Sequence, residues 1–227
     1  MNADPNASPF LDVPRTVVAL AAVIGGVEGM FSLAQAGYLG GDGGIGWRIN
    51  AISDFGFSGE ILDWMITTGQ FPLEHLRRFV TYPFLHLSFT HVLFSVVFIL
   101  AIGKAISGAF GGWRLLAVFF GASTFGAFVY GYLFEFLTPL VGSYPGIYGL
   151  IGAFTFLLWV RARVMGEAPM KAFSLIGFLL GIQLLFAAIF GSTGDWTADL
   201  AGFVAGFGMS FFLIPGGWAR LRDSLRR

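Results

Sequence analysis

Residues 142–154 read Gly142-Ser-Tyr-Pro-Gly-Ile-Tyr-Gly-Leu-Ile-Gly-Ala-Phe154, a short turn followed by an apolar helix with glycine at every third position. Small residues at this spacing line a helix face on which a neighbouring helix can pack closely inside a lipid bilayer. Gly202 and Gly206, four positions apart, form a second face of this kind. The stretch therefore predicts a membrane helix that packs closely against its neighbours.

The composition indicates a membrane protein. The 227 residues contain 13 Lys and Arg and 13 Asp and Glu, and 56% of them are apolar. The mean hydropathy is +0.77. So few charges could not cover a soluble surface, but lipid removes that need. The absence of cysteine excludes disulfides and thiol chemistry, and the zero net charge gives no support for nucleic-acid binding.

Six apolar segments are long enough, or nearly so, to cross about 30 Å of hydrocarbon at about 1.5 Å per residue. We place them at Val17–Tyr38, Phe84–Gly103, Leu115–Leu137, Gly146–Val160, Ala172–Phe190 and Ala198–Ile214. They predict an all-α membrane domain over residues 17–215, flanked by tails at 1–16 and 216–227, with a long outer loop at 39–83. The fourth segment covers only about 22 Å, so its outer end should lie below the membrane surface beside a wet cavity.

Basic residues predict the orientation of the spans, because cytoplasmic loops carry an excess of Lys and Arg. With six spans, most of the basic residues lie on one side: Arg15, Lys104, Arg114, Arg161, Arg163, Lys171, Arg220, Arg222, Arg226 and Arg227. The exceptions are Arg48, Arg77 and Arg78 in the long loop. We therefore expect a multi-pass protein of a bacterial inner (plasma) membrane with both termini in the cytoplasm.

Motifs along residues 76–210 resemble those of the rhomboid intramembrane serine proteases. The first motif keeps the family's arginine as Arg78 and its two histidines as His86 and His91. The family's tryptophan before that arginine is replaced by Arg77, and its asparagine four residues after the second histidine is replaced by Ser95. The resemblance implies a six-helix rhomboid-like bundle in which spans four and six pack together.

The other two motifs depart from the family at the residues that carry its chemistry. Residues 142–154 are similar to the family's Gly-x-Ser-Gly motif, but Tyr144 stands at the nucleophilic serine and Pro145 at the following glycine. Residues 198–206 resemble the segment that supplies the general base, with Asp199 in place of its histidine. His91 and Ser95 occupy the oxyanion positions. This pattern is typical of a pseudoprotease that binds transmembrane segments of client proteins.

Two alternatives remain open. An active endopeptidase with a non-standard site would need another nucleophile, and Ser143 is the weak candidate. One residue turns a helix by about 100°, so Ser143 should point away from Asp199. Tyr144 is a poor nucleophile, because an acyl-tyrosine would be unproductive. The second alternative is an unrelated channel or carrier that uses Asp199 and Glu28 as a polar path.

The intramembrane polar residues should satisfy one another. Tyr144 and Asp199 are expected at one depth in the membrane. The Tyr144 phenol should project toward span six and fill the substrate cavity. It should also donate a hydrogen bond to the Asp199 carboxylate. Ser95 lies one turn after His91 and is its expected partner. The sequence names no partner for Glu28. We expect no cofactor and no metal site. The expected partners are lipid and the transmembrane segments of client proteins, and the sequence makes no prediction of the oligomeric state.

Overall fold

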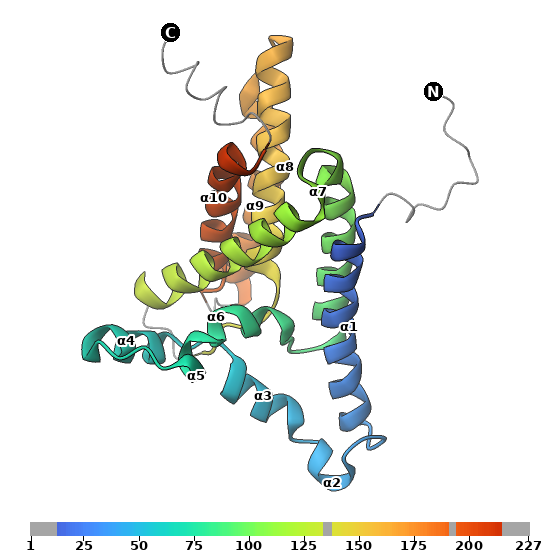
Figure 1. Cartoon of the computed structure of the whole chain (residues 1–227), viewed down its shortest axis with the longest axis vertical. Coiled ribbons are helices and arrows are strands. Elements are labelled where there is room, and N and C mark those ends of the chain that lie inside the picture. Colours follow the sequence, from blue (N-terminus) through green and yellow to red (C-terminus); the bar gives the residue numbers. More distant parts are fainter. Residues whose placement is uncertain (1–12, 134–137, 191–193, 215–227) are drawn as a thin grey trace, which may run out of the picture.

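Five long apolar helices span the computed structural model, which describes residues 13–133, 138–190 and 194–214 (Figure 1). These helices are α1 (Arg15–Gln35), α7 (Phe89–Leu133), α8 (Tyr144–Met165), α9 (Ser174–Phe190) and α10 (Trp196–Leu213). A 3-10 turn, η2 (Pro169–Phe173), leads into α9. Within the described ranges the only strand-like feature is an isolated bridge between Phe57 and Leu140. The predicted all-α membrane fold is confirmed.

Gly111 divides α7 into two limbs. The helix has 45 residues, about 67 Å, which is twice the thickness of the hydrocarbon core. Gly111 has non-helical angles, φ 68° and ψ 169°, which a residue with a side chain adopts only under strain. One limb runs beside α1 and the other crosses the bundle (Figure 1). The predicted gap between residues 103 and 115 is wrong, because both limbs continue almost to Gly111.

The segment between α1 and α7, predicted as a long loop, is largely helical. It contains α2 (Gly41–Gly44), α3 (Trp47–Phe55), α4 (Gly59–Thr68), α5 (Leu73–Leu76), α6 (Arg78–Thr81) and η1 (Tyr82–Phe84). Ser58 caps α4 by accepting a hydrogen bond from the Ile61 amide, and Gly69 ends the helix with φ 67°. A small core that includes Phe57, Leu62 and Met65 packs against Tyr130 of α7. These contacts hold the segment against one end of the bundle (Figure 1).

The central helix α8 is longer than predicted. It has 22 residues, about 33 Å, rather than the short span expected at Gly146–Val160. Most of the added length lies at its C-terminal end, where Gly166 terminates the helix in a left-handed conformation. α8 is therefore long enough to cross the hydrocarbon. Its length gives no reason to place its outer end below the membrane surface.

The glycine faces pack as the sequence predicts. A Cβ atom at Gly206 would overlap the Gly149 carbonyl, and one at Gly202 would overlap the Pro145 carbonyl. A Cβ at Gly152 would overlap the Phe203 carbonyl of α10. The backbones of α8 and α10 are thus as close as small residues permit.

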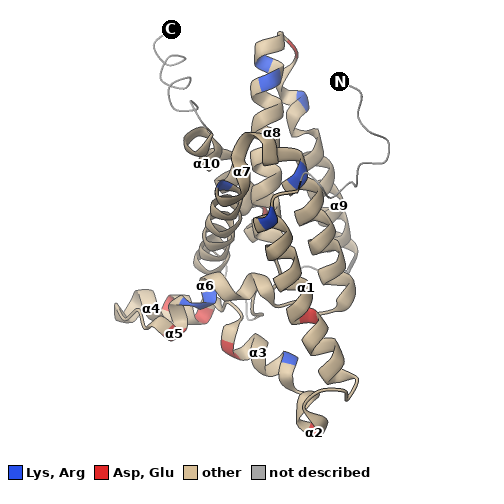
Figure 2. Ribbon diagram, turned by 45° about the vertical axis from the view of Figure 1, so that its right-hand side comes forward, with Lys and Arg blue, Asp and Glu red and all other residues tan. Residues whose placement is uncertain are grey.

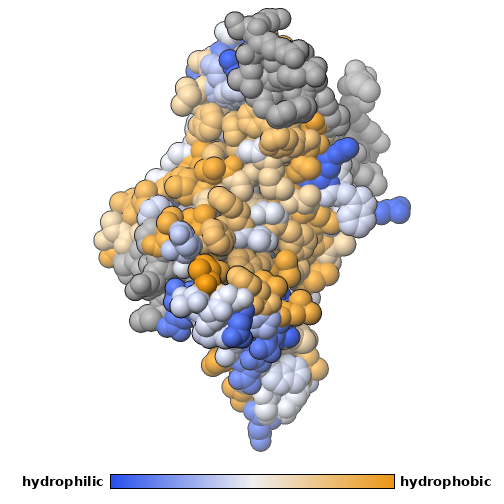
Figure 3. Space-filling model, turned by 60° about the vertical axis from the view of Figure 1, so that its left-hand side comes forward, coloured by the Kyte–Doolittle hydropathy of each residue, from blue (hydrophilic) through white to orange (hydrophobic). Residues whose placement is uncertain are grey.

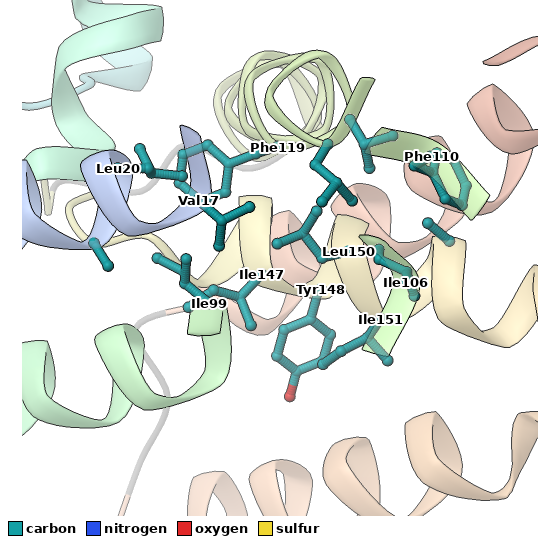
Figure 4. Close-up of a cluster of buried hydrophobic side chains, with 14 of the residues drawn as sticks. Val17, Leu20, Ile99, Ile106, Phe110, Phe119, Ile147, Tyr148, Leu150 and Ile151 are labelled. Atoms are coloured by element: carbon teal, nitrogen blue, oxygen red, sulfur yellow. The ribbon is translucent and has the colours of Figure 1, made fainter. Parts of the chain in front are cut away.

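The largest core surrounds α8. Ile147, Leu150 and Ile151 of α8 meet buried side chains of α1 and α7, such as Val17 and Phe119 (Figure 4). By contrast, α9 is mostly exposed, with large apolar side chains such as Phe178, Leu185 and Ile189 facing outward. A broad hydrophobic band crosses the middle of the face in Figure 3, and hydrophilic residues gather at its lower end. Such a band is the surface that a bilayer covers.

Charged residues are segregated along the bundle. In Figure 2, Lys and Arg gather at the upper ends of the long helices, while Asp and Glu are most frequent in the lower segments. Arg15 begins α1, Lys104 and Arg114 flank Gly111, and Arg163 lies in the last turn of α8. The basic C-terminal tail lies outside the described residues, as does most of the N-terminal tail.

Candidate functional site

A cavity of about 330 Å³ lies where α8, α9 and α10 meet near the start of α7. Its walls are largely apolar. The polar side chains at the cavity are those of His91, Tyr144, Tyr148, Gln183, Asp195 and Asp199. Three of the residues singled out in the sequence, His91, Tyr144 and Asp199, therefore meet at one site. Tyr144 lines the cavity without filling it, so the expectation that its ring would occupy the space is wrong.

Asp199 bonds to Gln183 rather than to Tyr144. The carboxylate is buried, with 3% of its surface exposed, although it lies in the first turn of α10. Its Oδ2 accepts a hydrogen bond of 2.7 Å from Gln183 Nε2. Gln183 Oε1 in turn accepts one of 3.1 Å from the Tyr148 hydroxyl. Asp199 Oδ1 has no hydrogen-bond partner among the described residues. The predicted bond between Tyr144 and Asp199 is wrong.

The ring of Tyr144 stacks on His91 instead. The two ring centroids are 5.1 Å apart and the planes differ by 16°. The amide of Gln183, not the phenol of Tyr144, lies beside Asp199. Sequence reasoning missed Gln183, although it is the one amide in the apolar helix α9. A lone polar residue within a membrane helix is itself a signal of a buried partner.

A second buried polar group surrounds His86. Ser143 Oγ donates a hydrogen bond of 2.9 Å to the Pro83 carbonyl. His86 Nε2 lies 3.0 Å from Ser143 Oγ and 3.2 Å from Ser95 Oγ. The expectation that Ser95 would partner His91 is therefore wrong, because Ser95 bonds to His86. The rings of His86 and His91 meet edge to face, 4.9 Å between centroids.

The proton positions in this group follow from the acceptors. The Ser143 hydroxyl uses its one hydrogen to donate to the Pro83 carbonyl. In the bond between Ser143 and His86, the donor is therefore the N–H at His86 Nε2. Burial, and next the nearby His91, lower the pKa of His86 to about 4, so its imidazole is neutral at neutral pH. A histidine that donates to a serine cannot also remove that serine's proton. Ser143 and His86 thus form a structural pair.

Glu28 has a partner that the sequence did not reveal. Arg48 forms two bonds to its carboxylate, 2.7 Å to Oε2 and 2.8 Å to Oε1, and Ser32 adds a third. Arg48 also donates 2.6 Å to the His86 carbonyl. The ion pair joins α1, α3 and the segment before α7. Because Glu28 is paired with Arg48, it is not free to form the polar path with Asp199 that the channel or carrier alternative requires.

The other loop arginines are also committed to local contacts. Arg78 donates to the carbonyls of Ser53 and Gly56, each at 2.8 Å. Arg77 lies over the Phe55 ring, 4.5 Å from its centroid. Together with the ion pair of Arg48, these contacts give each of the three arginines of the long loop a local partner.

No metal centre is evident in the described part of the chain, which holds no group of three or more His, Cys, Asp or Glu placed to bind an ion. His86 and His91 meet edge to face, and the first is bonded to hydroxyl groups.

The fold and the cavity define a class of protein: a multi-pass helical membrane protein with a cavity between its helices that contains several polar side chains. Residues 73–216, more than half of the chain, match the Rhomboid domain family model. The chain belongs to the rhomboid family. It is 31% identical over 138 residues, 60% of this chain and 67% of the relative, to the Bacillus subtilis (strain 168) protein described as "Putative rhomboid protease YdcA". Membership in this family means that the chain is related to rhomboids, contrary to the alternative of an unrelated channel or carrier.

Proposed function

We propose that this rhomboid protein is catalytically inactive and binds transmembrane segments of client proteins. The observation that carries the proposal is the occupancy of the two dyad positions. Tyr144 and Asp199 both lie at the cavity, but Asp199 bonds to Gln183 and Tyr144 stacks on His91. Acyl transfer needs a nucleophile hydrogen-bonded to its base. That pair is absent among the described residues at this cavity, while the space for a peptide remains.

The membrane placement is part of the proposal. We place the six-helix domain at residues 17–215 in a bacterial inner membrane, with both termini in the cytoplasm. The distribution of Lys and Arg supports this orientation, because the loop arginines on the opposite side are held in local contacts. Lipid covers the apolar helix faces, and the cavity beside the loosely packed α9 is where a client segment would enter.

The test uses the protein in lipid nanodiscs with a fluorescent single-span peptide. We expect saturable binding and no cleavage of the peptide by mass spectrometry. Ile182 lines the cavity, whereas Ile189 is exposed on the same helix away from it. Ile182→Trp should weaken binding at least about tenfold, and Ile189→Trp should leave it unchanged. Cleavage of the peptide, or equal effects of the two variants, would contradict the proposal.

The second candidate is an active endopeptidase with a non-standard site. Two observations favour it: Ser143 Oγ lies 3.0 Å from His86 Nε2, and a similar protein is described as a protease. Against it, both residues are fully buried and neither lines the cavity. The Ser143 proton is also directed to the Pro83 carbonyl. This candidate requires covalent labelling that depends on Ser143.

A further inference from the structure

The buried carboxylate of Asp199 has an unusual environment. One oxygen accepts from a neutral amide, and the other has no partner among the described residues. Burying a carboxylate in a membrane protein is costly unless a cation or several donors compensate for its lost hydration. Elsewhere in the chain the equivalent problem is solved, because the buried Glu28 has Arg48 and Ser32 as donors. Asp199 therefore has capacity for one more donor.

The other walls of the cavity favour a positive charge. Asp195 provides a second carboxylate at the same cavity. Tyr144 and Tyr148 add aromatic side chains, a residue type that attracts cations, although one face of Tyr144 is stacked on His91. Among the described residues that line the cavity there is no lysine or arginine. The site thus combines carboxylate and aromatic side chains with a buried acceptor oxygen that has no partner among the described residues.

The remaining walls select the kind of cation. Leu179, Ile182 and Pro145 give the cavity a largely apolar lining, and its volume of about 330 Å³ suits a small organic group. A bare metal ion would need several more oxygen or nitrogen ligands than this site offers. An ammonium group on an alkyl stem matches both parts of the site, with the head at Asp199 and the methylene groups against the apolar wall.

We propose that this cavity binds an alkylammonium group with Asp199 as its counter-ion, and that the natural source is a lysine side chain of the client transmembrane segment. The second clause rests on the proposed client binding, whereas the first does not. A lysine within a membrane segment is itself costly in lipid, so pairing with Asp199 compensates both charges at once. The site would therefore select clients that carry a basic residue near the outer end of the span.

Two arms of one experiment separate the ammonium site from client binding. In the first arm, the thermal unfolding of the protein in detergent micelles is measured with hexylammonium and with 1-hexanol. Hexylammonium should raise the Tm more than the neutral alcohol, because only the cation gains from Asp199. In the second arm, nanodiscs receive a Leu/Ala single-span peptide carrying one Lys or, at the same position, Met. The Lys peptide should bind about tenfold more tightly or better.

The controls are charge-matched variants. Asp199→Asn removes the charge and keeps an acceptor for Gln183, and it should abolish both the hexylammonium shift and the preference for the Lys peptide. Asp63→Asn removes an equal charge from an exposed position on α4 and should retain both. Hexylammonium stabilisation that depends on Asp199, with neither peptide binding, would support the ammonium site and overturn the client as its source. Equal binding of the Lys and Met peptides, with no difference between hexylammonium and hexanol, would overturn the ammonium site while client binding stands. Equal losses of the hexylammonium shift in Asp199→Asn and Asp63→Asn would also overturn the ammonium site.

Discussion

Two buried polar clusters lie side by side in this protein and are built on opposite principles. The fastening cluster contains Glu28, Arg48, His86, Ser95 and Ser143, and hydrogen bonds join each of its members to another part of the fold. The cavity cluster contains Tyr144, Tyr148, Gln183 and Asp199, and one carboxylate oxygen of Asp199 has no hydrogen-bond partner in the described part of the chain.

Adjacent residues belong to different clusters. Ser143 is buried against Pro83 and His86, while Tyr144 lines the cavity. A single step along the helix start is enough to separate the two directions. The first cluster ties the loop to the bundle, whereas the second lines the cavity that we propose as a ligand site.

The largest expected effect comes from breaking the ion pair of the fastening cluster. Arg48→Ala leaves Glu28 buried without its cation and should lower the free energy of unfolding by about 3–5 kcal/mol. Chemical denaturation of the protein in micelles measures this loss. The double variant Glu28→Leu with Arg48→Met removes both charges and should recover most of the stability. A loss below about 1 kcal/mol for Arg48→Ala would show that the cluster does not fasten the loop.

The next effect is the pH dependence contributed by His86. Its folded-state pKa of about 4 lies below the usual histidine value near 6.5, so protonation favours the unfolded chain. The stability contributed by neutral His86 is complete above about pH 6.5 and is lost as the pH falls toward 4, by up to about 3 kcal/mol. Unfolding of the parent and of His86→Gln should therefore converge in this window. Parallel pH profiles would contradict the burial of a neutral imidazole.

The cavity cluster should respond with the opposite sign. Asp199→Asn keeps the hydrogen bond from Gln183 and removes a poorly compensated buried charge, so stability should stay unchanged or rise by about 1 kcal/mol. Thermal unfolding of the ligand-free protein gives the comparison. A clear loss of stability in this variant would mean that Asp199 is a fastening residue, and the distinction between the clusters would fail.

The smallest expected effect concerns Tyr144. Its contribution is the ring stacked on His91, and its hydroxyl forms no bond with Asp199. Tyr144→Phe keeps the ring and should change the free energy of unfolding by less than about 0.5 kcal/mol. Tyr144→Leu, which removes the aromatic face, should cost more. A large loss in the Phe variant would restore the phenol–carboxylate bond that the sequence suggested.

The sequence predicted the fold well because its signals are local. Hydropathy located the spans, and the glycine spacing predicted the close approach of α8 and α10. The boundary at Gly111 was missed, because the apolar sequence continues on both sides of a single backbone break. The extent of α8 was underestimated, because its last turns contain arginines that extend beyond the apolar run.

Three of the residues singled out in the sequence line one cavity, but Ser95 lies away from it and the hydrogen bonds differ from those predicted. Equal depth along the helices brought His91, Tyr144 and Asp199 together, yet depth says nothing about which donor reaches an acceptor first. Gln183 reaches Asp199 from α9, and Arg48 reaches Glu28 from a loop helix 20 positions away. Such pairings depend on the rotation of each helix and on loop geometry. No periodicity in a single sequence encodes them.

Intact-mass spectrometry after treatment with a fluorophosphonate tests our proposal that this rhomboid site performs no serine-protease chemistry. The parent protein and Ser143→Ala are treated together with an active serine hydrolase that reports on the probe. The geometry predicts an unmodified mass for both rhomboid chains while the hydrolase is fully labelled. The Ser143 hydroxyl donates to the Pro83 carbonyl, and His86 donates to Ser143 Oγ, so His86 does not act as a base for Ser143. A stoichiometric adduct on the parent that disappears in Ser143→Ala would contradict the claim.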